Sequence, residues 1–292
     1  MNKTNIIWCD FTLNPHTGCV PVSEGCGHCY AGIIAERHRG LPSFPNGFGL
    51  TLKPHKLVSP YRLKEPALIF INSMSDLFLE ELEDWYRDLE IDLMEDTPQH
   101  EYQTLTKRVE AMLEYSKRRK LPPNLSVGVS IENNRRAYRI DILRQVDAKT
   151  RFLSIEPLLE RLSPENLDFS GIDMVITGGE SGAHLLDPKE RQRRGLVDYV
   201  NGIWIPRPER MDWIRDIRDA CLKQGVAFLH KQWGGKFPDS AGRTLDGRSH
   251  IDFPESWLRI EGAIERARAK DSKHEKKTDS VQPETRTQTY LR

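Results

Sequence analysis

The 292-residue sequence lacks net charge and long apolar runs. Its 43 lysine and arginine residues balance 43 aspartate and glutamate residues, so no overall charge draws the chain to nucleic acid or to a membrane, although a local basic groove is compatible with this balance. No apolar stretch approaches the length that spans a bilayer, and the one after residues 1–5 is too short for a signal peptide. We therefore expect a cytoplasmic protein with no membrane partner.

Cysteine is also scarce, but its distribution is uneven. Three of the five cysteines, Cys19, Cys26 and Cys29, share one short segment with the spacing Cys-x6-Cys-x2-Cys. Disulfides are rare in the reducing cytoplasm, so a disulfide framework is not expected. Glycine and proline interrupt any helix through this segment, while residues 31–37 can begin one. The sequence therefore predicts three thiols on a loop that leads into a helix.

Three neighbouring thiolates suit zinc or an iron–sulfur cluster, because both prefer soft sulfur ligands. A structural zinc site needs a fourth protein ligand, which Cys9 or His28 could supply. A four-iron cluster held by three cysteines instead leaves one iron open to an external ligand. The simplest alternative is three free thiols. Cys221 lies on an amphipathic stretch away from this loop and is expected to be a small buried apolar residue.

The sequence lacks the Gly-x-Gly-x-x-Gly and Walker patterns, which argues against a nucleotide phosphate loop of either kind. It does contain Gly178-Gly179-Glu180-Ser181-Gly182 directly after an apolar run. Unhindered backbone amides in such a turn can approach an anion or a carboxylate. The segment is therefore interpreted either as a ligand-binding turn or as a plain tight turn.

Short apolar runs alternate with amphipathic stretches along most of the chain. The strands are predicted at 6–9, 67–72, 102–106, 126–131, 151–155, 174–177 and 226–230, with helices that include 82–94 and 211–222. Such alternation requires crossover connections and a parallel sheet. Seven strands favour an α/β fold of the TIM-like type, a parallel (β/α) barrel that is either partial or closed.

Polar residues follow these strands, and the carboxyl ends of barrel strands share one mouth where ligands bind. The residues expected there are Ser75, Asp76, Thr106, Lys107, Arg108, Ser130, Glu132, Asn133, Ser154, Glu156, Glu180, Ser181, Lys231 and Gln232. Glu132 and Glu156 could bind a ligand or act as general acid or base, and Lys231 could hold a ligand carboxylate or phosphate. The alternative is a structural ion-pair network of these carboxylates with Lys107, Arg108 or Lys231.

The motifs together resemble an uncharacterised phage and mobile-element family, usually described only as phage proteins of unknown function. The motifs are NPHTGC at 14–19, SEGCGHCYA at 23–31, SMSDLF at 73–78, LTKR at 105–108, GVSIEN at 128–133, SIEPLL at 154–159, GGESG at 178–182 and KQWG at 231–234. The resemblance covers roughly residues 5 to 235. The family's three-cysteine motif is similar to that of radical S-adenosylmethionine (SAM) enzymes, whose usual spacing is Cys-x3-Cys-x2-Cys.

That similarity implies an iron–sulfur enzyme. Cys19, Cys26 and Cys29 would each bind one iron of a 4Fe–4S cluster, and the fourth iron would bind SAM. An electron donor would then drive cleavage of SAM to a 5′-deoxyadenosyl radical that abstracts a substrate hydrogen. The cofactor-binding residues would be Gly178, Gly179, Glu180, Ser181, Ser130, Glu132 and Lys107, and the catalytic residues Glu156 and Lys231. The phage-like family favours modification of a nucleobase or nucleic acid, while the sequence itself does not specify whether the substrate is a small molecule or a nucleic acid.

Two other classes of function stay open. One is a zinc protein that binds a nucleotide or nucleic acid without redox chemistry, and the other is a non-enzymatic, phage-encoded interaction protein. The domain prediction is a barrel over 1–261, with an arm or lid over 184–210 whose basic run could touch a polyanion. Residues 262–292 are so poor in apolar residues that a charged, disordered tail is expected.

Overall fold

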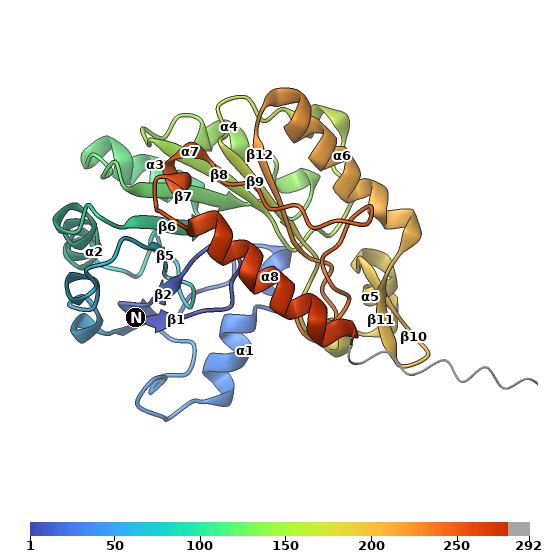
Figure 1. Cartoon of the computed structure of the whole chain (residues 1–292). Helices are drawn as coiled ribbons and strands as arrows, with labels where there is room; N and C mark the ends of the chain where they lie inside the picture. The colour runs from blue at the N-terminus through green and yellow to red at the C-terminus, as the bar shows by residue number, and fades with distance from the viewer. Residues whose placement is uncertain (280–292) are drawn as a thin grey trace, which may run out of the picture.

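Eight strands form one sheet in the computed structural model, which describes residues 1–279 (Figure 1). Its order is β1-β2-β5-β6-β7-β8-β9-β12, with β1 at Asn2–Lys3, β2 at Phe11–Leu13, β5 at Leu68–Ile71, β6 at Glu101–Thr106, β7 at Leu125–Ser130, β8 at Thr150–Ile155, β9 at Met174–Gly178 and β12 at Ala227–Gln232. All neighbours pair in parallel except β1 with β2. Within residues 1–279 no pairing joins β12 to β1 or β2. The predicted parallel α/β fold is confirmed in its open, partial form.

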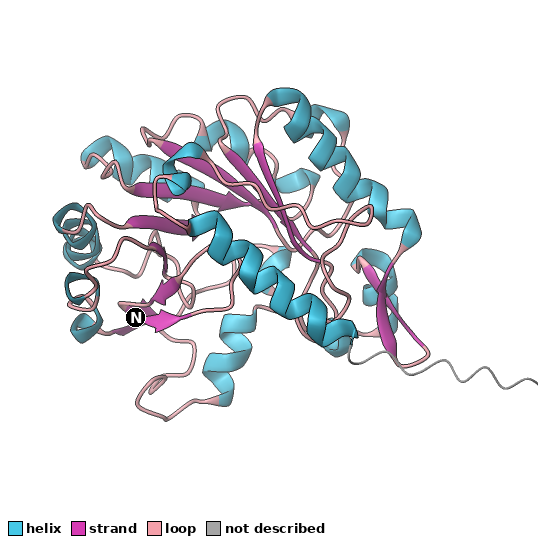
Figure 2. Cartoon of the chain, in the orientation of Figure 1, coloured by secondary structure: helices cyan, strands magenta, loops and turns pink. Residues whose placement is uncertain are grey.

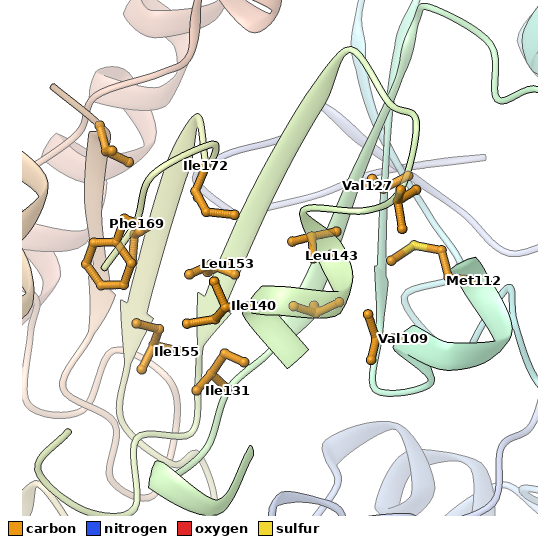
Figure 3. Close-up of a cluster of buried hydrophobic side chains, with 14 of the residues drawn as sticks. Val109, Met112, Val127, Ile131, Ile140, Leu143, Leu153, Ile155, Phe169 and Ile172 are labelled. Atoms are coloured by element: carbon orange, nitrogen blue, oxygen red, sulfur yellow. The ribbon is translucent and has the colours of Figure 1, made fainter. Parts of the chain in front are cut away.

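The outer face of the sheet packs against four helices that connect its strands. They are α2 (Asp84–Asp96), α3 (Val109–Arg118), α4 (Arg139–Leu143) and α6 (Pro208–Gln224). Alternate strand residues such as Val127, Leu153 and Ile155 contribute to this cluster, and Figure 3 shows them beside Met112 of α3 and Ile140 of α4. Because strand side chains alternate between the two faces of the sheet, every second residue of a strand packs against the helices.

The other strand residues build a second, inner core. Phe70, Phe152, Ile176 and Leu229 pack there with other buried residues, including Trp257 of α7 (Glu255–Leu258). Helix α8 (Ala263–Asp279) lies across this face in Figure 1. The amino-terminal part of the inner face is therefore filled with side chains, which leaves the carboxyl ends of the strands for a site.

The predicted strand at residues 6–9 is wrong. These residues form a turn, and the first strand of the parallel set is β2. Ile7 and Trp8 are instead buried in the inner cluster, where the Trp8 ring lies 4.6 Å from that of Phe70. The apolar run is a turn whose side chains pack into the inner core, and such a segment has the same short apolar pattern as a buried strand.

The predicted boundary after residue 261 is also wrong. Ala263 and Ala267 of α8 are buried in the inner cluster. Arg266 pairs with Asp10 at 2.7 Å, and Lys270 donates to the Ile6 carbonyl at 3.1 Å. The first turns of this segment thus belong to the barrel domain. The rest of the predicted tail, residues 280–292, lies outside the described residues.

The remaining elements surround the mouth of the sheet. They are β3 (His16–Thr17), α1 (Tyr30–Arg37), β4 (Thr51–Leu52), α5 (Pro188–Arg194), β10 (Val197–Val200) and β11 (Ile203–Pro206). The predicted 184–210 arm contains α5 and a hairpin of β10 with β11, which Figure 2 shows at the edge of the molecule. None of the helices in residues 1–279 combines the length and the apolar character that crossing a bilayer requires.

Candidate functional site

The three-cysteine loop lies over the carboxyl ends of the strands. It follows β3, where Gly18 bridges to Ser75 after β5, and it ends at Cys29, the residue that precedes α1. All three cysteines are free and half buried. Burial raises the pKa of the Cys19 thiol to about 11, and the Asp76 carboxylate is the second cause of this rise. Cys26 is close enough to add to it. Metal coordination would displace this proton, because a bound metal deprotonates a thiol.

Two strand ends hold the loop in place. Arg108, after β6, donates to the Cys19 sulfur at 3.4 Å and to the Val20 carbonyl at 2.8 Å. Ser23 donates to Glu132, after β7, at 2.5 Å. Gly25 packs directly on the same carboxylate, since a Cβ at this position would lie 2.6 Å from the Glu132 side chain. The loop is therefore fixed by interactions with residues that the sequence analysis placed at the mouth.

Glu132 is saturated by these interactions. Its side chain is 0% exposed and pairs with Arg139 of α4 at 2.9 Å, while Lys107 lies 3.7 Å away and also donates to Ser130 at 3.3 Å. A pocket of about 170 Å³ opens beside this network and is lined by Val22, Lys107 and Arg139 among others. Glu132 thus acts as the anchor of the cysteine loop, and Lys107 is its most exposed charged neighbour.

Asp76 provides a second buried anchor. Its carboxylate accepts from the Thr106 hydroxyl at 2.7 Å and from the Phe78 amide at 3.0 Å, and it pairs with Arg108 at 3.2 Å. Glu80 binds the same guanidinium at 2.5 Å. Asp76 therefore orients the arginine that touches Cys19, in addition to capping the turn that follows it.

Glu156 and Lys231 meet at the other end of the mouth. The Lys231 ammonium donates to both carboxylate oxygens of Glu156, at 2.7 and 2.9 Å, from the next strand but one. Both side chains keep about a fifth of their surface exposed, 23% for Lys231 and 18% for Glu156. Gly178 on the strand between them makes the space, because a Cβ there would lie 3.0 Å from the Glu156 carboxyl carbon. The pair is formed but remains accessible.

Glu180 is the most unusual carboxylate of the site. It is buried and pairs with Arg194 of α5 through one oxygen at 2.8 Å, while the other oxygen has no hydrogen-bond partner within the described residues. Burial raises the pKa of Glu180. Gly179 before it allows a close backbone approach, since a Cβ there would lie 1.9 Å from the Trp233 carbonyl oxygen. Ser181 accepts from Gln232 at 3.1 Å.

The end of the cysteine loop connects the two halves of the mouth. The Tyr30 hydroxyl donates to the Ser73 carbonyl at 2.5 Å. Burial raises the pKa of that hydroxyl, and the nearby Cys29 and Glu156 raise it further. The pKa of His28 is lowered by its burial and by Arg194. The Tyr30 hydroxyl therefore lies near both Cys29 and Glu156.

The three thiols of this loop are, by their chemistry, compatible with a 4Fe–4S cluster. Within residues 1–279, no three His, Cys, Asp or Glu side chains are grouped so that they could hold one metal ion. Cys9, a candidate fourth zinc ligand, is 2% exposed in the inner core, and burial raises the pKa of its thiol to about 12. A four-iron cluster distributes its thiolates over separate irons and requires no fourth protein ligand. The free, half-exposed thiols of Cys19, Cys26 and Cys29 meet that requirement.

The residues predicted to bind the cofactor or to act in catalysis lie in two groups at the strand ends. Lys107, Ser130 and Glu132 lie with the cysteine loop, whereas Glu156, Gly178, Gly179, Glu180, Ser181 and Lys231 lie together on the far strands. The sequence analysis missed the buried partners Arg139 and Arg194. Arg194 lay within the noted basic run, while no local pattern marks Arg139 as the partner of Glu132.

Comparison with known proteins identifies a family and a set of similar structures. No curated protein matches the chain. Solved structures of spore photoproduct lyase are similar, including one variant at 14% identity and a TM-score of 0.46, with 78% of this chain and 77% of that chain covered. The enzyme complexed with dinucleoside spore photoproduct is 14% identical, with a TM-score of 0.45 and 75% of each chain covered. Another variant, with bound AdoMet and the same dinucleoside, is 12% identical, with a TM-score of 0.45 and 75% of each chain covered.

The family assignment is more direct. The family described as "Protein of unknown function (DUF5131)" matches residues 3–200 and 205–254, so the match passes over residues 201–204. Most of the described chain, including the cysteine loop and both groups of mouth residues, lies within the matched ranges. The chain belongs to this family.

Proposed function

We propose that this chain is an iron–sulfur enzyme of the radical SAM type that modifies a nucleobase or a nucleic acid. The observation that carries the proposal is the loop with Cys19, Cys26 and Cys29. Its thiols are free and half exposed, and they lie over the strand ends, with the accessible Glu156–Lys231 pair at the other end of the same mouth. Three thiolates suit a 4Fe–4S cluster and leave one iron open.

The resemblance of the motif gives the chemistry that such a group would bring. Cys19, Cys26 and Cys29 would hold the cluster, and the bound cluster and SAM would supply radical removal of a hydrogen atom from the substrate. Arg108, whose guanidinium lies 3.4 Å from the Cys19 sulfur, favours the thiolate form that coordination needs. The protein itself contributes binding, orientation and exclusion of water.

Glu180 is the residue best suited to bind the cationic amino group of SAM. It is a buried carboxylate with one oxygen unsatisfied within the described residues, and an unsatisfied buried acceptor is costly unless a ligand fills it. Arg194 fixes the other oxygen and so sets the direction of the free one. Ser181 and Gln232 line the same turn.

Glu156 and Lys231 are the proposed catalytic pair. The two side chains form an ion pair, but both remain accessible, so a substrate can contact either without a large rearrangement. A carboxylate and an ammonium in contact can pass a proton to or from a polar group of the substrate. Ser130 and Lys107 are proposed to contact the cofactor, while Glu132 positions the loop that carries the cysteines.

Anaerobic reconstitution with iron and sulfide tests this proposal. We expect about four irons and four sulfides per chain, a reduced paramagnetic signal that changes when SAM is added, and 5′-deoxyadenosine when an electron donor such as dithionite is supplied. Each of Cys19→Ala, Cys26→Ala and Cys29→Ala should abolish the intact cluster. Cys9→Ala and Cys221→Ala are the matched controls, because both thiols are buried away from the loop.

The opposite outcome is equally specific. A chain that binds one zinc tightly, acquires no cluster with iron and sulfide, and forms no 5′-deoxyadenosine is not a radical SAM enzyme. In that case the zinc content of the three cysteine variants would show whether the same loop is a zinc site.

A further inference from the structure

The β10–β11 hairpin presents aromatic side chains next to the mouth. Asn201 and Gly202 form its two-residue turn, both with positive φ, as a tight hairpin requires. Tyr199 and Trp204 are directly opposite each other, and their rings lie 5.0 Å apart. Residues directly opposite in a hairpin share one face. One face of this hairpin is therefore aromatic, and Tyr199 is 56% exposed on it.

This aromatic face adjoins the candidate site. A Cβ on Gly235 would lie 3.1 Å from the Trp204 ring, so the loop after β12 packs against the hairpin. Gly235 also bridges to Ser181, the residue after Glu180. Phe237 in the same loop is 59% exposed. Tyr199, Trp204 and Phe237 thus form an aromatic rim that leads toward the Glu180 side of the mouth.

Cations without carboxylate partners accompany these rings. The Arg191 guanidinium lies 5.7 Å from the Trp204 ring centre, and the Lys236 ammonium lies 5.4 Å from that of Phe237. Within the described residues, neither has an ion-pair partner, although most arginines nearby do: Arg194 binds Glu180, Arg193 binds Glu190 and Arg207 binds Asp198. Within the described residues, these two cations therefore place positive charge that no carboxylate neutralises next to the exposed rings.

Stacking rings combined with uncompensated cations are the features by which proteins hold single-stranded nucleic acid, because bases stack on the rings and phosphates meet the cations. We propose that the rim formed by Tyr199, Trp204, Phe237, Arg191 and Lys236 binds a single strand of DNA or RNA and guides it to the mouth. The role of the bound strand as a substrate rests on the proposed function. Binding of the strand to the rim does not require the cluster.

The opposite face of the hairpin supplies the control. Val200, Ile203 and Ile205 are exposed there, and the charge of Asp198 on the same face is neutralised by its ion pair with Arg207. An aliphatic face suits a protein partner or a second copy of this chain better than a nucleic acid. Substitution of Ile203 should therefore leave strand binding unchanged while it removes any association through that face.

Fluorescence anisotropy with labelled oligothymidine and oligouridine of about 15 nucleotides tests the rim on the full chain. We expect Tyr199→Ala and Phe237→Ala each to weaken binding about tenfold, in line with the loss of one base stack. Lys236→Gln should lower the slope of log affinity against log salt by about 0.7, as expected for one lost phosphate contact. Ile203→Thr should bind like the unchanged chain, and comparison of the two oligonucleotides distinguishes DNA from RNA.

The measurement is made on the chain before and after reconstitution, so that the two proposals fail separately. Strand binding without any cluster would retain the rim and reject the radical enzyme. An active cluster with no oligonucleotide binding, or with equal binding by all four variants, would reject the rim. A dimer that Ile203→Thr converts to a monomer, with no oligonucleotide bound, would assign the hairpin to a second copy and overturn the proposal.

Discussion

The two halves of the mouth use the same residue types to different ends. At β6 and β7, Glu132 is 0% exposed and its oxygens are taken by Ser23 and Arg139. At β8 to β12, Glu156 and Lys231 keep about a fifth of their surface in contact with solvent, and Glu180 keeps one oxygen free within the described residues. Saturated pairs hold a loop in place, whereas unsaturated or accessible groups remain available to a ligand.

Removal of the Glu132 charge should produce the largest effect on stability. Glu132→Gln leaves the Arg139 guanidinium, 1% exposed, without its carboxylate partner, which costs about 3–5 kcal/mol for a broken buried pair. Urea denaturation of the metal-free chain measures this loss. Glu114→Gln is the control, because its pair with Lys117 is exposed and contributes under about 1 kcal/mol. A loss below about 1 kcal/mol for Glu132→Gln would remove the distinction between the halves.

Ending the chain after Glu261 should have the next largest effect and should not favour either half. It removes the buried Ala263 and Ala267 and the Arg266 pair with Asp10, so we expect a loss of about 2–4 kcal/mol from exposed inner core. Thermal unfolding by circular dichroism provides the measurement, and a chain that ends after Asp279 keeps α8 as the control. Equal stability of the two chains would mean that α8 does not contribute to the core.

The pH dependence of stability should sharpen the comparison at β12. Burial lowers the pKa of His230 to about 3, so below about pH 6.5 the unfolded chain takes up a proton that the folded chain refuses. Stability should therefore fall as the pH drops, by about 2 kcal/mol between pH 7 and 5 from this residue alone. Urea denaturation at both pH values should show a flatter dependence for His230→Gln. The exposed His55 is the control, and an unchanged slope for His230→Gln would contradict the prediction.

Changes at Glu156 and Lys231 should have the smallest effect on folding. The pair is partly exposed, so Glu156→Gln and Lys231→Met should each cost about 1 kcal/mol or less. The same variants should nevertheless weaken SAM or substrate binding. Circular dichroism melts together with ligand calorimetry separate the two effects. If either variant melts as early as Glu132→Gln, the pair is structural and the two halves are alike.

The parallel sheet was predictable because each buried strand is a short, continuous apolar run. Residues 102–106 and 126–131 were predicted as strands, and the structure has β6 and β7 there within a residue or so of these bounds. Residues 6–9 show the limit of this signal, since a turn that packs into the core and a buried strand are equally apolar. Only the tertiary contacts of Trp8 distinguish the two.

Other features were missed because their partners are distant or their signals are weak. Alanines buried at α8 carry too little apolar surface to stand out among charges, so Ala263 and Ala267 looked like part of a tail. The Asn201-Gly202 pair between two β-prone runs is a sufficient signal for the hairpin, although the neighbouring basic run is the more conspicuous feature of this segment. Which carboxylates of the mouth would be saturated depends on long-range pairing, as with Arg139, and no local pattern reports it.

The open sheet also bears on how the chain resists aggregation. An unclosed barrel has two edges, and a free edge is a template on which another chain can add a strand. Here β1 offers only two residues on one side. On the other, β12 is covered by residues 250–252, where the His230 amide donates to the His250 carbonyl and Ile251 bridges to Leu229. The barrel can thus remain unclosed although neither edge of its sheet offers a long free strand for pairing with another chain.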